Sequence, residues 1–95
     1  MSILLVEDEP AIAATVVYAL REEGLEARHC LTAGEALEAA SATDFELAIL
    51  DVGLPDLGGF ALCRRLREVR DLSVIFLTAR QDEADRIRGF ELGAD

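Results

Sequence analysis

Three short apolar runs divide the chain, and each is continuous rather than alternating. They cover Ile3–Val6, Leu47–Leu50 and Ser73–Leu77. Continuous apolar runs of this length are typical of strands that are covered on both faces of a parallel sheet. A more polar run at Glu26–Cys30 predicts a further short strand at a sheet edge. The pattern therefore predicts four strands, with the second one in the chain at an edge.

Segments with helical periodicity separate the strands. In Pro10–Glu23 apolar residues recur at helical spacing, at Ile12, Val16, Ala19 and Leu20. Pro10 suits a first helical turn and Gly24 suits a C-terminal cap, so both ends of this helix are marked.

Three more helices follow along the chain. Thr32 and Glu35 have the spacing of a capping box, which predicts a helix running through Ser41. After the turn-rich stretch at 53–59, a helix is expected from about Phe60 to Val69, with Cys63, Leu66 and Val69 on one face. The last helix is expected from about Asp82 to Leu92.

This alternation predicts a single α/β domain over residues 1–95, a doubly wound parallel sheet with helices on both faces. In such sheets ligands bind beyond the carboxyl ends of the strands. The side chains that end each apolar run are therefore the candidates for chemistry.

Composition narrows the class of function. The net charge is −10 and every basic residue is Arg, so direct contact with nucleic acid by this segment is disfavoured and a divalent cation is favoured. No apolar run reaches the roughly 20 residues of a membrane span, and the start lacks the features of a signal peptide, so a cytoplasmic location is expected. Cys30 and Cys63 are interpreted as buried small hydrophobes.

Carboxylates and a hydroxyl follow three of the strands. Glu7 and Asp8 end the first run, Asp51 ends the second, and Thr78 follows the third. Carboxylates that meet at one edge cannot all stay ionised without a cation, and an all-oxygen ligand set suits Mg²⁺. Asp51 is the candidate nucleophile for a phosphoryl group, and Thr78 is the candidate donor to a phosphoryl oxygen.

Several single residues have structural interpretations that need no ligand. Asp8 on its own has the position of a helix cap before Pro10. His29, the only histidine, is interpreted as a surface or half-buried residue of the edge strand, not as a metal ligand or phosphotransfer group. Gly58 and Gly59 are interpreted as turn geometry before a helix rather than as a phosphate-binding loop.

Four motifs together resemble the receiver domains of two-component response regulators. They are Leu-Val-Glu-Asp-Glu-Pro, the stretch Leu-Asp-Val-Gly-Leu-Pro-Asp-Leu-Gly-Gly around Asp51, Leu-Thr-Ala-Arg and Glu-Leu-Gly-Ala-Asp. The resemblance implies a flavodoxin-like sheet of order 2-1-3-4. It implies that Asp51 accepts a phosphoryl group from a sensor histidine kinase, with Mg²⁺ held by Glu7, Asp8, Asp51 and the backbone carbonyl of Gly53. Thr78 would be the switch hydroxyl.

The wording of the motifs most resembles the branch in which a winged-helix DNA-binding domain follows the receiver, so transcriptional output is expected from a domain outside this chain. Receivers of this family continue into a fifth strand with a switch aromatic, a Lys-Pro pair and a fifth helix, which this sequence does not contain. A partial receiver is therefore expected, with self-association through the exposed edge of the Ser73–Leu77 strand.

Two other functions stay open at this point. A Mg²⁺-dependent phosphohydrolase with an Asp nucleophile would want a second acid two residues after Asp51, where this chain has Gly53. A pseudo-receiver would act as an interaction module without phosphorylation, which the missing Lys permits. The predicted protein is a signalling switch that catalyses its own phosphorylation and dephosphorylation, not a turnover enzyme.

Overall fold

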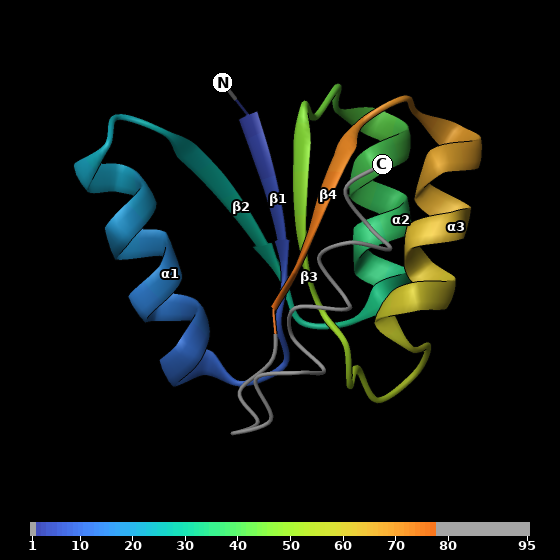
Figure 1. The fold of residues 1–95 in the computed structure, drawn as a ribbon, viewed down its shortest axis with the longest axis horizontal. Coiled ribbons are helices and arrows are strands. Elements are labelled where there is room, and N and C mark those ends of the chain that lie inside the picture. The colour runs from blue at the N-terminus through green and yellow to red at the C-terminus, as the bar shows by residue number, and fades with distance from the viewer. Residues whose placement is uncertain (1, 78–95) are drawn as a thin grey trace.

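The computed structural model describes residues 2–77, which alternate regularly between strand and helix. Figure 1 shows the elements in chain order: β1 (Ser2–Val6), α1 (Pro10–Glu22), β2 (Glu26–Cys30), α2 (Ala33–Ala42), β3 (Leu47–Asp51), α3 (Gly59–Val69) and β4 (Ser73–Leu77). All four predicted strands are present. The helix predicted from Asp82 to Leu92 lies outside the described residues.

The strands form one parallel sheet in the order β2-β1-β3-β4, as predicted. In the pairing of β1 with β3, Val6 lies opposite Leu50. The residues that follow Val6 and Leu50 therefore emerge side by side at the carboxyl end of the sheet. The polar strand β2 lies at one edge of the sheet, which confirms its prediction as an edge strand.

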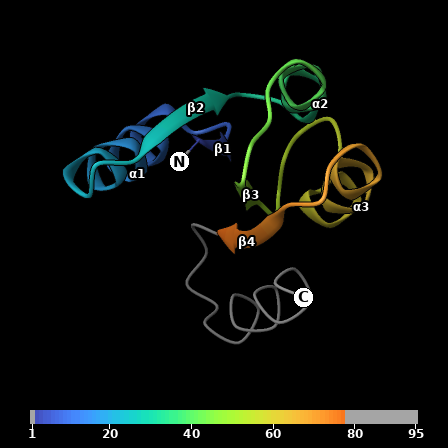
Figure 2. The same ribbon diagram turned by 90° about the horizontal axis from the view of Figure 1, so that it is seen from above.

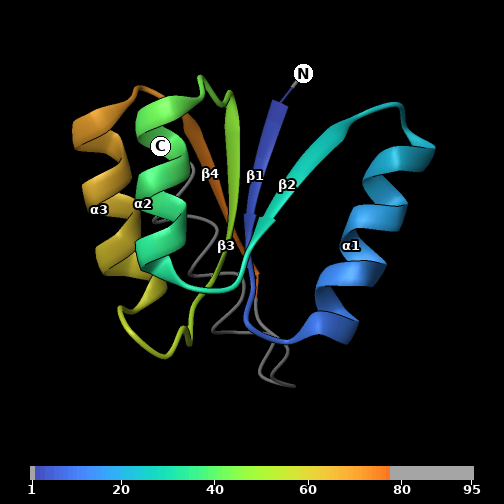
Figure 3. The same cartoon turned by 180° about the vertical axis from the view of Figure 1, so that it is seen from behind.

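Among residues 2–77, two helices lie on one face of the sheet and one on the other (Figures 2 and 3). On one face, α2 and α3 pack over a core that includes Leu4, Leu50 and Val74. The fully buried residues of α2 are all alanines, which let the helix lie close to the sheet: Ala33, Ala36, Ala39 and Ala40. On the other face, α1 covers Ile3, Leu5 and Ile49. Both faces of β1 and β3 are thus buried, which explains their uninterrupted apolar runs.

The ends of α1 form as the sequence predicts. Pro10 occupies the first turn, and Gly24 follows the helix with a φ of 79°, a left-handed conformation that favours glycine. The N–H groups of Gly24 and Leu25 donate to the carbonyls of Arg21 and Leu20, at 2.9 Å and 3.0 Å. This is the Schellman arrangement, in which the last carbonyls of a helix are satisfied by the reversal of the chain.

The start of α2 differs from the predicted capping box in one bond. Thr32 is the N-cap, and its hydroxyl accepts a hydrogen bond from the N–H of Glu35 at 3.2 Å, as expected. The Glu35 carboxylate, however, accepts from the N–H of Leu31 at 3.0 Å and not from that of Thr32. The Glu35 side chain therefore bonds one residue before the N-cap, to Leu31 in the short connection between β2 and α2.

The predicted helix faces need correction at three points. Ala19 is exposed, and the buried side of α1 includes Ala13 and Val17 instead. Val69 is 47% exposed, so the core face of α3 is carried by Leu62, Cys63 and Leu66. Helix α3 also begins one residue earlier, at Gly59. Both cysteines are buried and free, as interpreted from the sequence. No helix among residues 2–77 has the length and apolar character needed to cross a membrane.

Candidate metal centre

Three carboxylates meet at the carboxyl end of the sheet. Glu7 and Asp8 directly follow β1, and Asp51 is the last residue of the adjacent strand β3. One oxygen from each carboxylate lies within 4.8 Å of the other two. The structure thus brings together three of the residues that the sequence singled out, because neighbouring parallel strands end at the same edge.

Glu7 is the most constrained of the three. It is 1% exposed, and its Oε2 accepts a hydrogen bond from the N–H of Glu9 at 3.0 Å. Its Oε1 is buried and has no hydrogen-bond partner. Burial raises the pKa of Glu7, and the charges of Asp51 and Asp8 raise it further, while the Glu9 N–H opposes the rise. An unsatisfied buried oxygen of this kind destabilises the fold unless a ligand meets it.

Asp51 is half-buried, and its surroundings both raise and lower the pKa of its carboxyl. Burial raises the pKa of its carboxyl, and the neighbouring Asp8 raises it too. The N–H group of Gly53 donates to the carboxylate and lowers its pKa, and the Val52 N–H, which donates to the Leu77 carbonyl at 3.2 Å, adds a smaller lowering. A carboxylate oriented by its own loop and facing an acidic neighbour is well placed to share a cation and to act as a nucleophile.

These residues fit a hard divalent cation. The donor set consists only of oxygen, one donor is buried without a partner, and Asp8 is exposed, which leaves a side open to water. Mg²⁺ favours such sets because it keeps several waters beside a few carboxylates. The competing interpretation of Asp8 as a helix cap is not supported, because the N-cap of α1 is Glu9 and no side-chain cap bond forms there.

The family model for the response regulator receiver domain matches residues 3–95. The chain belongs to this family. Among curated relatives, this receiver is 46% identical over 95 residues to the transcriptional regulatory protein CreB of Escherichia coli K12. That match covers 99% of the chain and 42% of CreB, so the chain spans about two fifths of the length of this relative.

Solved structures agree with the receiver fold. The response regulator TrrA of Thermotoga maritima, in complex with Mg²⁺-BeF, is 33% identical with a TM-score of 0.79, over 84% of this chain and 70% of TrrA. A response regulator from Burkholderia pseudomallei with a phosphorylated aspartic acid, calcium ion and citrate is 27% identical with a TM-score of 0.82, over 99% and 56% of the two chains.

The β3–α3 loop of the receiver is fastened by an aspartate whose role the sequence did not reveal. The Asp56 carboxylate accepts hydrogen bonds from the N–H groups of Ala33 and Gly34 at 3.0 Å and 3.1 Å. It thus caps the first turn of α2 from another loop, and these bonds lower its pKa. The sequence shows only an Asp in a turn-rich stretch. It does not indicate that this Asp bonds to the start of a helix 22 or 23 residues away.

Gly59 holds the far end of the same loop. Its N–H donates to the Val52 carbonyl at 3.0 Å. A Cβ at this position would collide with the carbonyl oxygen of Asp51 and lie 3.0 Å from the Cα of Val52. The start of α3 therefore rests on the backbone that carries Asp51, which explains a glycine that the sequence assigned only to turn geometry.

His29 is a further residue at the site that the sequence did not identify. It is exposed on β2, as expected, but its Nε2–H donates to the Glu7 carbonyl at 2.7 Å. Of the remaining predicted site residues, Gly53 directs its N–H to Asp51, and the role of its carbonyl as a metal ligand stays a prediction. Thr78 lies outside the described residues of the receiver.

Proposed function

We propose that this receiver accepts a phosphoryl group on Asp51 and acts as the input switch of a two-component response regulator. The observation that carries the proposal is the all-oxygen cluster of Glu7, Asp8 and Asp51, in which Glu7 is buried and its Oε1 has no hydrogen-bond partner. As part of an ionised carboxylate, such an oxygen destabilises the fold until a cation meets it, and a cation beside a carboxylate nucleophile is the arrangement needed for phosphoryl transfer.

Asp51 performs the chemical step. One of its carboxylate oxygens attacks phosphorus, and a P–O bond forms as the P–N bond to a donor phosphohistidine breaks. The departing imidazole takes up a proton and leaves neutral. Hydrolysis of the acyl phosphate by water later releases inorganic phosphate and restores the Asp51 carboxylate. The N–H group of Gly53 keeps this carboxylate oriented during the attack.

Glu7, Asp8, Asp51 and the Gly53 carbonyl would hold Mg²⁺. When bound, Mg²⁺ supplies positive charge that neutralises the phosphoryl oxygens. Thr78 is proposed as the hydroxyl that contacts the phosphoryl group and transmits its presence.

The partner and the output follow from the family and the relatives. A sensor histidine kinase is the proposed phosphodonor, in the cytoplasm. Because CreB is described as a transcriptional regulatory protein, we propose transcriptional output through a winged-helix DNA-binding domain outside this chain. The net charge of −10 disfavours direct DNA contact by the receiver itself.

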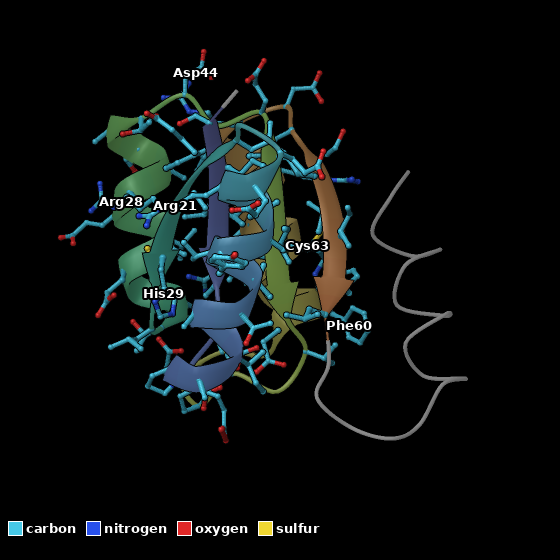
Figure 4. The ribbon with its side chains drawn as sticks, turned by 90° about the vertical axis from the view of Figure 1, so that its left-hand side faces the viewer. Arg21, Arg28, His29, Asp44, Phe60 and Cys63 are labelled. Atoms are coloured by element: carbon cyan, nitrogen blue, oxygen red, sulfur yellow. The ribbon has the colours of Figure 1, made fainter. Side chains whose placement is uncertain are left out.

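Labelling with a small phosphodonor tests the proposal in the intact protein. Incubation with acetyl phosphate and Mg²⁺ should add one phosphoryl group, with acetate as the leaving group, and EDTA should prevent the addition. Asp51→Ala should remove the label. Asp44→Ala is the matched control and should keep it, because Asp44 is an exposed aspartate before β3, at the other end of the strands (Figure 4).

Each other outcome favours a different function. A label that persists in Asp51→Ala, or that forms equally well in EDTA, would contradict the phosphoacceptor role. Continuous turnover of phosphoesters would favour the Mg²⁺-dependent phosphohydrolase, although Gly53 occupies the position where that class needs its second acid. A folded protein that binds no Mg²⁺ and takes no label would favour the pseudo-receiver.

Self-association through β4 remains a separate proposal. Within the described sheet, β4 forms the edge opposite β2, and exposed edges pair readily with other strands. Light scattering of the 95-residue chain should therefore detect dimers or larger species. A single monomeric species at all concentrations would contradict this proposal.

A further inference from the structure

We infer that His29 is a positioning residue for the metal centre, and that its imidazole fixes the backbone of Glu7. The inference rests on the proposed function, since it concerns how the same site is held ready for Mg²⁺. It is carried by the 2.7 Å hydrogen bond from Nε2 of His29 to the Glu7 carbonyl, together with the burial of the Glu7 side chain.

The bond lies where the ladder between β1 and β2 ends. The paired register of the two strands stops at Val6 and Cys30. One further ladder bond forms, from the Glu7 N–H to the Cys30 carbonyl at 3.1 Å. Beyond Cys30 the chain turns into α2, whose N-cap is Thr32. The His29 side chain takes the place of the next backbone donor and satisfies the Glu7 carbonyl.

Both backbone polar groups of Glu7 are thus held by the end of β2. The Glu7 side chain is held separately, by the bond from the Glu9 N–H to Oε2. With its backbone and Oε2 fixed, Glu7 offers one carboxylate oxygen to the cluster with Asp8 and Asp51, and its Oε1 is buried without a hydrogen-bond partner. Without the His29 bond, the Glu7 carbonyl would lose its hydrogen-bond partner and the Glu7 backbone could move. The Glu7 carboxylate would then be held less firmly in the position that binding Mg²⁺ requires.

The location of the imidazole agrees with this role. In Figure 4 His29 lies toward the end of the molecule opposite Asp44, beside α1. It borders a shallow hollow together with Pro10 and Ala13 of α1, the helix that follows the acidic pair. Because a carbonyl only accepts, Nε2 carries a hydrogen, and both the neutral Nε2–H tautomer and the imidazolium can donate this bond.

Two substitutions test whether the hydrogen-bond donor of His29, rather than its ring, is what matters. His29→Val removes the donor and keeps a residue suited to a strand. His29→Gln keeps an N–H donor, because the Nε2 of Gln lies the same number of bonds from Cα as the Nε2 of His. Mg²⁺ binding to the intact proteins is measured by calorimetric titration with MgCl₂, beside wild type and Asp51→Asn. Thermal melting in EDTA verifies that every variant is folded.

We expect His29→Val to weaken Mg²⁺ binding about tenfold and His29→Gln to recover most of that loss, as for other groups that orient a metal-ligating residue. Amide exchange of the Glu9 N–H in EDTA supplies a readout without metal. It should accelerate in His29→Val and return toward the wild-type rate in His29→Gln, while exchange in the core strand β3 stays unchanged.

The failure modes are distinct. If wild type binds Mg²⁺ and Asp51→Asn does not, but His29→Val matches wild type, the inference about His29 is overturned and the proposed function stands. Equal losses in His29→Val and His29→Gln would also overturn it, because the donor would then not be the cause. If wild type shows no Asp51-dependent Mg²⁺ binding, the proposed function fails and the positioning role fails with it.

Discussion

Two acidic regions at the carboxyl end of the sheet have opposite electrostatics. In the cluster of Glu7, Asp8 and Asp51, burial and mutual repulsion raise the pKa values of Glu7 and Asp51. In the β3–α3 loop, Asp56 is exposed, and two backbone N–H groups at the start of α2 lower its pKa. The two regions use the same chemical group, and their surroundings give it opposite roles.

The number of carboxylate oxygens that already have hydrogen-bond partners distinguishes Asp56 from Glu7. Both carboxylate oxygens of Asp56 are already engaged by the protein, so this residue stabilises the fold and has little left to offer a ligand. Glu7 keeps one buried oxygen without a partner, which opposes folding and favours a cation. The receiver therefore has at this acidic cluster a destabilisation that a ligand can relieve.

We expect the largest effect from a substitution at Gly59, where the start of α3 packs against the backbone of Asp51. Gly59 packs its Cα against the backbone of Asp51 and Val52, so Gly59→Ala forces the start of α3 away from the loop. We expect a loss of about 1–3 kcal/mol in the free energy of unfolding, as for other overpacked positions, together with weaker Mg²⁺ binding. Urea denaturation and MgCl₂ titration measure the two effects.

Gly58→Ala is the matched control for this change. The nearest atom to a Cβ at Gly58 is the Val52 carbonyl oxygen at 3.9 Å, an ordinary contact, and its φ of −58° suits any residue. Because Gly58 is the N-cap of α3, where Ala is less favourable than Gly, the variant should lose less stability than Gly59→Ala, and its Mg²⁺ affinity should stay close to wild type. If the two alanine variants behave alike, the close approach of α3 to Asp51 is not what requires glycine at position 59.

Neutralising the buried acid should stabilise the metal-free protein. Glu7→Gln keeps an acceptor for the Glu9 N–H and removes the charge that burial disfavours, so we expect a gain of about 1–2 kcal/mol at neutral pH in EDTA. Denaturation in EDTA and in MgCl₂ measures it. The gain should disappear or reverse in saturating MgCl₂, because the variant binds the cation poorly.

The pH dependence of that gain has a definite sign. The folded-state pKa of Glu7 lies above its ordinary value of 4.5, so in the window above 4.5 the folded state holds a proton that the unfolded chain has released. The stability of wild type therefore falls as pH rises through this window. The advantage of Glu7→Gln should be largest at neutral pH and shrink toward pH 4.5. An advantage independent of pH would show that the charge of Glu7 is not its cause.

The sequence predicted most of this architecture and the centre of the site. The uninterrupted apolar runs around Leu4 and Ile49 exist because both faces of the sheet are covered, and the positions of Glu7, Asp8 and Asp51 follow from where parallel strands end. The missed features are side chains that bond to the backbone of another element. Asp56 and His29 reach main-chain groups 22 or 23 residues away, and no periodicity encodes such contacts.

Added Mg²⁺ should stabilise the folded protein by relieving the repulsion within the cluster of Glu7, Asp8 and Asp51. A cation that binds only the folded state raises its stability by about 1.4 kcal/mol when its concentration is ten times the dissociation constant. Thermal melting of wild type with and without MgCl₂ should show this rise, and chelation should reverse it. Asp51→Asn should lose the rise. An equal rise in Asp51→Asn would indicate general screening of the net charge of −10 rather than binding at the cluster.

The smallest expected effect concerns Asp56, whose pH dependence should have the opposite sign to that of Glu7. The bonds to Ala33 and Gly34 hold the folded-state pKa of Asp56 below its ordinary value of 3.8, so its contribution is fully present above 3.8 and is lost as pH falls through the folded-state pKa. Asp56→Ala should lower Tm at neutral pH by less than Gly59→Ala does, and this deficit should narrow below pH 3.8. Asp56→Asn keeps one oxygen acceptor and should fall between wild type and Asp56→Ala. A deficit that grows on acidification would mean that the carboxylate is not the capping species, and that the two acidic regions do not differ in the way the hydrogen bonds indicate.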